Sequence, residues 1–390
     1  MNNQSTSSSL HKTDVVVVGA GIVGLAITYH AAKQGKSVQV FERNQWAVGA
    51  SVRNFGLIWP IGQAAGSLLD RAKRSQATWR ELSSKVGFGL QENGSLHLAY
   101  HADEQAVIEE FLHQAGEDYQ CQWLSAEEIR EKSPAVKMEG LLGGLFSATE
   151  CTIDPREAIR KLPKYLSETY GVQFHFGSVV NSVEGNILRV GEKTSKADHI
   201  YVCSGADFET LFPEEFQQVP ITKCKLQMLR TVPQPDGWQL GSTLCGGLTL
   251  RHYAAFANCP SLSALAKRFD DEQPLYKEWG IHVMVTQNHF GELVIGDSHE
   301  YGLTHDPFDW GDVDQLILDY LSTFAKVPRL EIAQRWHGIY PKLPGATELV
   351  LHPSEEVTIV NALSGAGMTL SFGLAEEIMA GEYEKVSLTK

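Results

Sequence analysis

The segment GAGIVG at residues 19–24 places three glycines at a spacing that lets a protein backbone hold a pyrophosphate. Gly19 allows a tight turn, Gly21 lets the backbone approach the phosphate oxygens, and Gly24 lets the following helix pack closely on a strand. The N-terminus of that helix would then present its N–H groups to the phosphates. The segment therefore predicts dinucleotide binding. Its other contact residues are Ala20, Ile22 and Val23.

The elements around these glycines follow the order strand, turn, helix, strand. An apolar run at residues 15–18 precedes the glycines, a helical pattern continues to Lys33, and a second apolar run ends at Glu42. Glu42 lies about 20 residues beyond the glycines, where a carboxylate can accept hydrogen bonds from a ribose, and Arg43 follows as a further contact. This order predicts a βαβ unit that binds a dinucleotide. NAD and FAD both use such a unit, so the segment leaves both open.

The chain does not continue with further βα repeats. A helix is expected over residues 67–86, and an irregular, sheet-like stretch with charged connections follows it. An amphipathic helix over residues 154–170 and strands near 172–176 and 179–184 then indicate a return to the first domain. An apolar run at 199–203 also belongs to it and ends in a second nucleotide turn, Ser204-Gly205.

The second domain is expected to be inserted into the first. Alternating strands fill most of residues 220–335, with a helical segment near 312–324. The last segment is a strand at 357–361, the glycine-rich turn LSGAGMTLSFG and a helix to about Ala380. We predict a first domain at residues 12–85, 150–215 and 336–390, and a second at residues 86–149 and 216–335.

These motifs together resemble a known superfamily. The combination of GAGIVG, Glu42, GASVRNFG, CSGAD and SGAGMT is similar to FAD-dependent amine oxidoreductases of the D-amino acid oxidase and glycine oxidase superfamily, over essentially the whole chain. More narrowly, RNFGLIWPIGQ, RHYAAF with NCPS, GDSHEYG and RWHGIYPKLPG resemble the branch proposed to oxidise aminophosphonates related to 2-aminoethylphosphonate. The resemblance implies an α/β fold: a Rossmann-like FAD-binding domain with an inserted, mainly antiparallel-sheet substrate domain.

The resemblance also assigns cofactor contacts. The three glycines would hold the FAD pyrophosphate, Glu42 the ribose, and the backbone of Val180 the adenine. The WHGIYPKLPG stretch does not present a Cys or His in the manner of relatives with covalent flavin, so noncovalent FAD is expected. The other implied contacts are Ser51, Arg53, Asn54, Phe55, Gly56, Ser204, Gly205 and Gly338.

The C-terminal turn has a chemical role in this interpretation. When a flavin accepts hydride, negative charge develops at N1 and the C2 carbonyl, so backbone donors and a helix N-terminus would stabilise the reduced state. The residues suited to this role are Gly365, Ala366, Gly367, Met368 and Thr369.

The implied reaction is hydride transfer from the carbon that bears an amine to flavin N5, followed by hydrolysis of the imine. His299, in GDSHEYG, stands where family members present residues above the flavin. Because histidine titrates near neutrality, His299 could hold or deprotonate the amine.

Tyr340 marks a departure from the superfamily pattern. Amino-acid oxidases of the superfamily commonly place an arginine here to bind the substrate carboxylate. The absence of that arginine removes a contact that depends on the geometry of the guanidinium. The departure favours a different anion, such as a phosphonate. Arg251, His252 and Tyr253, together with Lys342, could supply its donors, and Tyr340 would line the substrate site.

The sequence allows other functions as well. The substrate could instead be glycine, sarcosine or a D-amino acid, if another arginine replaces the missing one. FAD could also be structural, in a non-catalytic assembly or binding protein, because fold alone does not fix function. The C-terminal turn disfavours an NAD-dependent dehydrogenase. The sequence does not choose between oxygen and a quinone as electron acceptor, and it leaves the oligomeric state open.

Composition excludes several function classes. The 390 residues contain 33 Lys plus Arg against 47 Asp plus Glu, and this formal charge of −14 argues against nucleic-acid or anionic-membrane partners. No window approaches the roughly 18 apolar residues that a membrane span needs. Residues 1–13 lack the apolar core of a secretory signal, so we expect a frayed tail and a cytoplasmic protein.

Cysteine usage and motif content predict no metal. The six cysteines show no CxxC pair and no framework spacing, which favours reduced thiols over disulfides or zinc. The sequence also lacks HExxH and an acidic calcium loop. We therefore expect a small-molecule enzyme without a metal.

Overall fold

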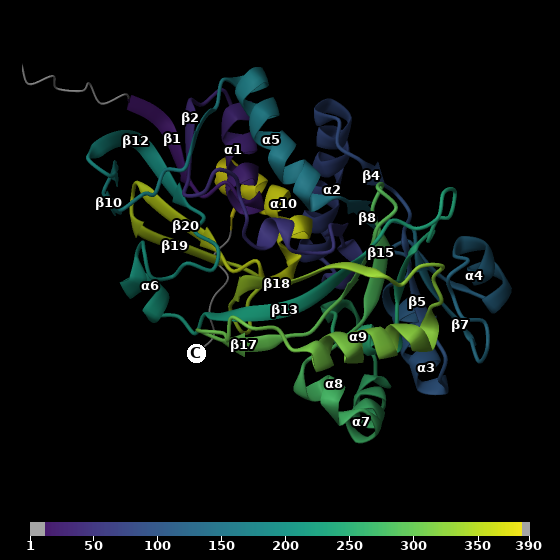
Figure 1. Cartoon of the computed structure of the whole chain (residues 1–390). Helices are drawn as coiled ribbons and strands as arrows, with labels where there is room; N and C mark the ends of the chain where they lie inside the picture. Colours follow the sequence, from purple (N-terminus) through teal and green to yellow (C-terminus); the bar gives the residue numbers. More distant parts are fainter. Residues whose placement is uncertain (1–11, 384–390) are drawn as a thin grey trace, which may run out of the picture.

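The first sheet of the protein contains the predicted βαβ unit. A computed structural model describes residues 12–383. Strand β1 (Lys12–Val18) pairs in parallel with β2 (Val38–Glu42), and helix α1 (Ile22–Lys33) connects them (Figure 1). Every residue of β2 is buried, as expected for a parallel strand covered on both faces. The motif therefore has the backbone arrangement that its sequence predicts.

The rest of this sheet comes from distant segments. Its order is β10-β11-β12-β1-β2-β9, and β20 pairs in parallel with β12. Helices α1, α2, α5 and α10 pack on one another beside this sheet. The bounds of the remaining strands are β9 Gln173–Phe176, β10 Ser182–Glu184, β11 Ile187–Val190, β12 Lys193–Val202, β19 Leu349–Ser354 and β20 Val357–Asn361. Those of the helices are α2 Ser67–Val86, α5 Pro155–Tyr170 and α10 Gly367–Ala380.

A second, nine-stranded sheet forms the other half of the molecule. Its order is β17-β13-β16-β15-β14-β5-β7-β6, with β18 paired to β13, and only the β14–β5 pair is parallel. The predicted antiparallel sheet is thus confirmed. Its strands are β5 Ser95–Ala99, β6 Cys121–Leu124, β7 Gly143–Ser147, β13 Thr222–Thr231, β14 Thr243–Cys245, β15 Met284–Gln287, β16 Leu293–Gly296, β17 Glu300–Gly302 and β18 Ile332–Lys342.

Helices accompany this second sheet, and a small sheet completes the fold. In Figure 1, helices α7, α8 and α9 lie together below it. These and the other helices are α3 Ala102–Ala115, α4 Ala126–Lys132, α6 Pro213–Gln217, α7 Leu262–Glu272, α8 Pro274–Glu278 and α9 Gly311–Phe324. The small sheet contains β3 Leu57–Ile58, β4 Leu90–Gln91 and β8 Cys151–Ile153. No helix within residues 12–383 is both long and apolar enough to cross a membrane.

Several predicted elements differ from the structure in detail. The predicted strand over 179–184 contains only Ser182–Glu184, and Val180 precedes it. The predicted domain boundary at residue 336 falls inside β18, which pairs with β13 of the second sheet along its length. Residues 1–11 of the predicted tail lie outside the described residues, and residues 12 and 13 begin β1. All six cysteines are free thiols, as predicted.

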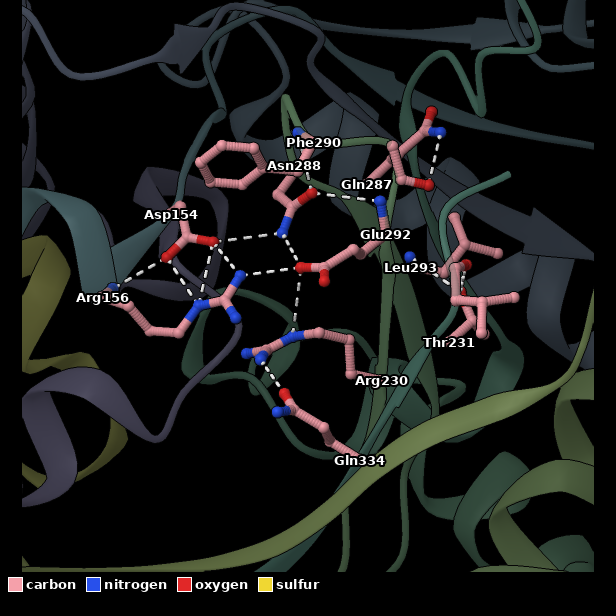
Figure 2. Close-up of polar contacts among 12 residues, drawn as sticks. Asp154, Arg156, Arg230, Thr231, Gln287, Asn288, Phe290, Glu292, Leu293 and Gln334 are labelled. Atoms are coloured by element: carbon pink, nitrogen blue, oxygen red, sulfur yellow. Dashed lines mark hydrogen bonds and ion pairs between the residues drawn. The ribbon is translucent and has the colours of Figure 1, made fainter. Parts of the chain in front are cut away.

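A polar network joins the start of α5 to the second sheet (Figure 2). Asp154 caps α5 by accepting a hydrogen bond from the backbone N–H of Arg156 at 2.8 Å. Asn288 donates to Asp154 at 3.1 Å and to Glu292 at 2.9 Å. Glu292 also pairs with Arg156 at 2.7 Å and with Nε of Arg230 at 3.7 Å. Charged and polar side chains therefore connect the two halves of the molecule.

A buried histidine in β5 gives a prediction about acid stability. His97 is 1% exposed beside the rings of Trp59 and Phe256, and burial lowers its pKa to about 3. The unfolded chain, with a histidine pKa of about 6.5, binds more protons between these values. Stability is therefore full above pH 6.5 and falls as the pH drops. We expect His97 to remove about 2 kcal/mol of unfolding free energy between pH 7 and 5.

The His97→Phe variant tests this expectation. It keeps an aromatic ring but cannot titrate, so its unfolding free energy, measured by urea denaturation, should decline less steeply between pH 7 and 5. The exposed His113, replaced by Gln, should leave the slope of the unmodified chain unchanged. A His97→Phe slope equal to that of the unmodified chain would contradict the assignment.

Candidate functional site

One large cavity of about 690 Å³ runs between the two sheets. At one end it meets the carboxyl ends of parallel strands, at Val18, Glu42 and Cys203. Ligands commonly bind at this edge of open α/β sheets. At the other end it reaches strands β13, β15 and β18 of the second sheet. The cavity is within the volume range of cofactor and ligand sites.

The glycines of the first turn have distinct roles. Gly19 has φ +100°, and a Cβ there would lie 2.3 Å from the carbonyl oxygen of Cys203. A Cβ at Gly24 would lie 1.9 Å from the carbonyl oxygen of Gly19, so close packing excludes any side chain. At Gly21 the nearest atom is the hydroxyl of Ser51, 3.0 Å away, and the residue faces the cavity. Gly21 thus leaves room for a ligand.

The N-terminus of α1 opens into the same space. Its N-cap, Gly21, has no side chain with which to cap the helix, and its first turn has no acidic residue. Ser51 accepts a hydrogen bond from the N–H of Ile22 at 2.9 Å. Ile22 and Val23 also line the cavity. Uncapped N–H groups and the positive end of the helix dipole suit phosphate oxygens.

Glu42 is buried and held in place at the cavity wall. One carboxylate oxygen accepts a hydrogen bond from Ala20 N–H at 3.1 Å, and the other accepts one from Asn44 N–H at 3.0 Å. These bonds keep the side chain at the end of β2, where a ribose would reach it. Nearby, Arg43 forms an ion pair with Asp207, and both line the cavity.

The second nucleotide turn lies beside the first. Gly205 has φ +60°, and the side-chain amide of Asn361 donates to its carbonyl oxygen at 3.0 Å. Asn361 ends β20, so one bond connects the turn after β12 to the next strand of the sheet. Ser204, Gly205 and Val180, which the sequence predicted as cofactor contacts, line the cavity.

The loop after residue 50 is held by its own polar side chains. Arg53 donates to the carbonyl oxygens of Val48 at 2.8 Å and His337 at 3.2 Å. Asn54 accepts from Gly56 N–H at 2.7 Å. A Cβ at Gly338 would lie 2.9 Å from the backbone oxygen of Arg53, so β18 and this loop approach closely. Predicted residues of this region that line the cavity are Ser51, Arg53, Asn54, Phe55 and Gly338.

The C-terminal turn places a second helix N-terminus at the cavity. The N-cap of α10 is Ala366, and no side chain caps it. Ala362 and Ser364 adopt positive φ angles of 54° and 53°, which non-glycine residues rarely do. The hydroxyl of Thr369 accepts a hydrogen bond from Trp59 N–H at 2.9 Å. All five predicted residues of this turn, 365–369, line the cavity.

These observations fit FAD. The cavity has a glycine turn open to phosphate at Gly21, a carboxylate for a ribose at Glu42, and two uncapped helix N-termini. Four predicted residues do not line it: Ala20, Gly24, Gly56 and Arg251. Gly24 and Gly56 instead serve close packing, since a Cβ at Gly56 would lie 2.0 Å from the backbone oxygen of Ile153. Ala20 contributes its N–H to Glu42.

The opposite end of the cavity collects polar side chains from the second sheet. Tyr340 is 8% exposed, and burial raises its pKa well above the usual value, so it stays a neutral hydroxyl. Tyr253 and Lys342 lie along the same wall. Arg251 points elsewhere: its guanidinium pairs with Asp270 at 2.9 Å and lies over the ring of Phe269. The structure thus places Lys342, rather than Arg251, at the cavity.

His299 lies in this end of the cavity, as predicted, but is a weaker base than expected. Its Nδ1 lies 2.9 Å from the carbonyl oxygen of Gly280, which can only accept, so Nδ1 carries the proton and Nε2 a lone pair. Burial lowers the pKa of His299 to about 4. The hydrogen bond to Gly280 acts to raise this pKa, and the positive charge of Lys342 acts to lower it. The imidazole is therefore neutral near pH 7.

Three functional candidates escaped the sequence predictions. Asp297, His282 and Met284 also line the cavity. Nε2 of His282 lies 3.3 Å from Oδ1 of Asp297 and Nε2 of His299 lies 3.9 Å from Oδ2. Burial raises the pKa of Asp297 well above its usual value and lowers that of His282 well below its own. Asp297 is the acidic residue of GDSHEYG itself, two residues before His299, and that position was the one available signal.

Comparison with known proteins agrees with this geometry. The family described as "FAD dependent oxidoreductase" matches residues 14–380. Glycine oxidase from Bacillus licheniformis is 24% identical over 355 residues, which cover 88% of this chain and 85% of that protein. The structure of glycine oxidase from Geobacillus kaustophilus aligns with a TM-score of 0.75 at 20% identity, over 97% of both chains. That of L-proline dehydrogenase from P. horikoshii has a TM-score of 0.75 at 19% identity, over 97% and 96%.

The structural likenesses support the fold, and the family match extends over nearly all described residues. The match also decides the cofactor, because the βαβ unit alone allowed either NAD or FAD. The chain therefore belongs to the family of FAD-dependent oxidoreductases, and FAD is its cofactor.

Proposed function

We propose that this enzyme oxidises a small primary or secondary amine that also carries an anion, and that the preferred substrate is an aminophosphonate related to 2-aminoethylphosphonate. When bound, FAD supplies the acceptor for a hydride from the carbon that bears the amine, and water then hydrolyses the imine. The chain's own residues bind the two ends of the substrate. Nε2 of His299 accepts a hydrogen bond from the amine, and Lys342 attracts the anion.

Lys342 carries the argument for a phosphonate. It lines the cavity two residues beyond Tyr340, and its ammonium lies 3.1 Å from the hydroxyl of Tyr301. Within residues 12–383, no carboxylate oxygen lies within 4.0 Å of it. An ammonium that bonds to one tyrosine hydroxyl and, among the described residues, pairs with no carboxylate suits a rounded, multiply charged group, whereas a planar carboxylate is better matched by the guanidinium that Tyr340 replaces.

The second candidate is an amino-acid substrate such as glycine, sarcosine or a D-amino acid. It is favoured by the relatives, since the protein from Bacillus licheniformis bears the name glycine oxidase. In this case Lys342 would bind a carboxylate as a single point charge.

Anaerobic reduction of the bound flavin separates these candidates. The enzyme is mixed without oxygen with 2-aminoethylphosphonate, its N-methyl derivative, glycine, sarcosine or D-alanine, and loss of the visible flavin absorbance is recorded. We expect the phosphonates to bleach the flavin fastest. Bleaching by glycine or D-alanine alone would overturn the phosphonate assignment and keep the reaction type. No bleaching by any amine would overturn the proposed function.

The electron acceptor is proposed to be oxygen or a quinone. Readmitting air to the substrate-reduced enzyme distinguishes them, because an oxidase regains its flavin colour at once. An enzyme that stays reduced in air but recovers on adding a soluble quinone would be a dehydrogenase.

A further inference from the structure

Asp297 is a buried carboxyl group that the binding roles above leave unused. It follows β16, is 5% exposed and lines the cavity. Among residues 12–383, its Oδ1 has no hydrogen-bond partner of good geometry, although Nε2 of His282 lies 3.3 Å away. Its nearest side-chain nitrogens belong to His282 and His299, and no lysine or arginine in the described part of the chain lies within 4.0 Å. A carboxylate in this position lacks the cation that buried acids usually require.

Asp297 and His299 present two acceptors to the same point. Nδ1 of His299 donates to Gly280, so its Nε2 has a lone pair. This atom lies 3.9 Å from Oδ2 of Asp297, too far for a direct hydrogen bond. One nitrogen with two N–H groups can bond to both, since each N–H···acceptor bond spans about 2.9 Å. The missing partner is therefore a small cationic nitrogen donor.

We propose that Asp297 binds the ammonium group of the substrate, together with Nε2 of His299, and accepts its proton. This inference rests on the proposed function and adds that the amine enters the cavity as a protonated ammonium. Hydride departure requires a lone pair on nitrogen, which an ammonium lacks. Asp297 is thus a catalytic residue, and Lys342, also on the cavity wall, binds the other end of a zwitterion.

The proposed step is a proton transfer only. One N–H bond of the ammonium breaks, its electron pair stays on nitrogen, and an O–H bond forms on Oδ2 of Asp297. Nothing is oxidised in this step, and the neutral amine remains hydrogen-bonded between the new carboxylic acid and His299. The charged pair of carboxylate and ammonium contains the same number of protons as the neutral pair of carboxylic acid and amine. Because burial disfavours charged groups, it favours the neutral pair.

A metal ion is the alternative cation for this pocket. Ring nitrogens of His252, His282 and His299 lie within 4.8 Å of one another. The rings of His282 and His299, however, are stacked with an inclination of 19°, while the His252 ring is tilted by 32° from His282 and by 42° from His299. In-plane lone pairs of the two nearly parallel rings, His282 and His299, do not converge on one point, as a tetrahedral metal requires. The geometry favours the ammonium.

The pH dependence of flavin reduction tests the proposal. The Asp297→Asn variant lacks the carboxylate that accepts the proton, and His299, whose pKa burial lowers to about 4, is too weak a base to replace it, so the variant should oxidise only the free neutral amine. An alkyl ammonium with a pKa of about 10.4 is roughly 0.4% neutral at pH 8. We expect reduction a few hundredfold slower than in the unmodified enzyme at pH 8, rising about tenfold per pH unit and approaching the unmodified rate above about pH 10. Other titratable groups facing Asp297 are His252, His282, His299, Tyr253, Tyr340, Cys224 and Lys342.

A matched control and a restoring variant exclude a merely structural effect. Asp314 is another largely buried carboxyl with a raised pKa, but it does not line the cavity, so Asp314→Asn should keep the unmodified pH profile. Asp297→Glu restores the carboxyl and should regain part of the activity at pH 8. An Asp297→Asn profile that parallels the unmodified one would overturn the proposal.

A binding measurement works without turnover. Dissociation constants are measured from the flavin spectrum for 2-aminoethylphosphonate against 2-hydroxyethylphosphonate, and for glycine against glycolate. The unmodified enzyme should prefer the ammonium of at least one pair, and Asp297→Asn should lose that preference. If Asp297→Asn prefers the ammonium ligand as strongly as the unmodified enzyme does, the inference is wrong, even if amines reduce the flavin. A preference for the ammonium ligand that is lost in Asp297→Asn supports the ammonium site, even if no amine reduces the flavin.

Stoichiometric zinc in the purified enzyme, released by His282→Asn, would assign the pocket to a metal instead.

Discussion

The Gly21→Val enzyme is expected to fold normally and to lose FAD. Gly21 lines the cavity at the start of α1, and a Cβ there would meet only the hydroxyl of Ser51, at 3.0 Å. The apo chain can accommodate it with a small shift. The valine methyl groups, however, would occupy the space where the pyrophosphate approaches the uncapped N–H groups of the helix.

The size of this effect follows from the hydrogen bonds lost. Bonds to a charged group contribute about 1.5–3 kcal/mol each, so losing two raises the FAD dissociation constant about a hundredfold or more. The measurement is a titration of the apo protein with FAD, in which the quenching of flavin fluorescence reports binding. Circular dichroism of the apo protein should be unchanged.

Gly311 offers a matched control. It begins α9, no atom lies within 4 Å of a Cβ placed there, and it does not line the cavity. Gly311→Val should therefore bind FAD like the unmodified chain. Retention of FAD by Gly21→Val would mean that the pyrophosphate does not pass along the N-terminus of α1.

The Lys342→Met enzyme is expected to bind its substrate about ten- to a hundredfold more weakly. The lysine supplies the ammonium at the substrate end of the cavity, and one hydrogen bond to a charged group is worth about 1.5–3 kcal/mol. Methionine keeps most of the side chain's apolar length. Because the proposed role of the lysine is to bind the anion rather than to act at the reacting carbon, the rate of flavin reduction at saturating substrate should change little.

Stopped-flow reduction over a range of substrate concentrations separates these two quantities. The exposed Lys326, which is outside the cavity, serves as control in the variant Lys326→Met. Equal apparent affinity in Lys342→Met and in the unmodified enzyme would show that another group binds the anion. A large loss of rate at saturation, with affinity intact, would place Lys342 at the reacting centre instead.

The sequence by itself determined the cofactor half of this protein. Its signals are local: Gly19 and Gly24 contact one another within a single turn, and Glu42 follows on the next strand. Backbone conformation over a few residues is enough to require glycine at such positions. The C-terminal turn at 365–369 was readable for the same reason, since a strand, a glycine turn and a helix follow each other directly.

Only the tertiary structure decided the substrate half. Asp297 and His282 meet because β15 and β16 pair, and Arg251, predicted to bind substrate, is drawn away by Asp270 on α7. His299 was predicted as a base titrating near neutrality, but its burial lowers its pKa to about 4. Distances between residues far apart in sequence, and the burial that sets their charge, depend on how whole strands and helices pack. No local pattern contains that information.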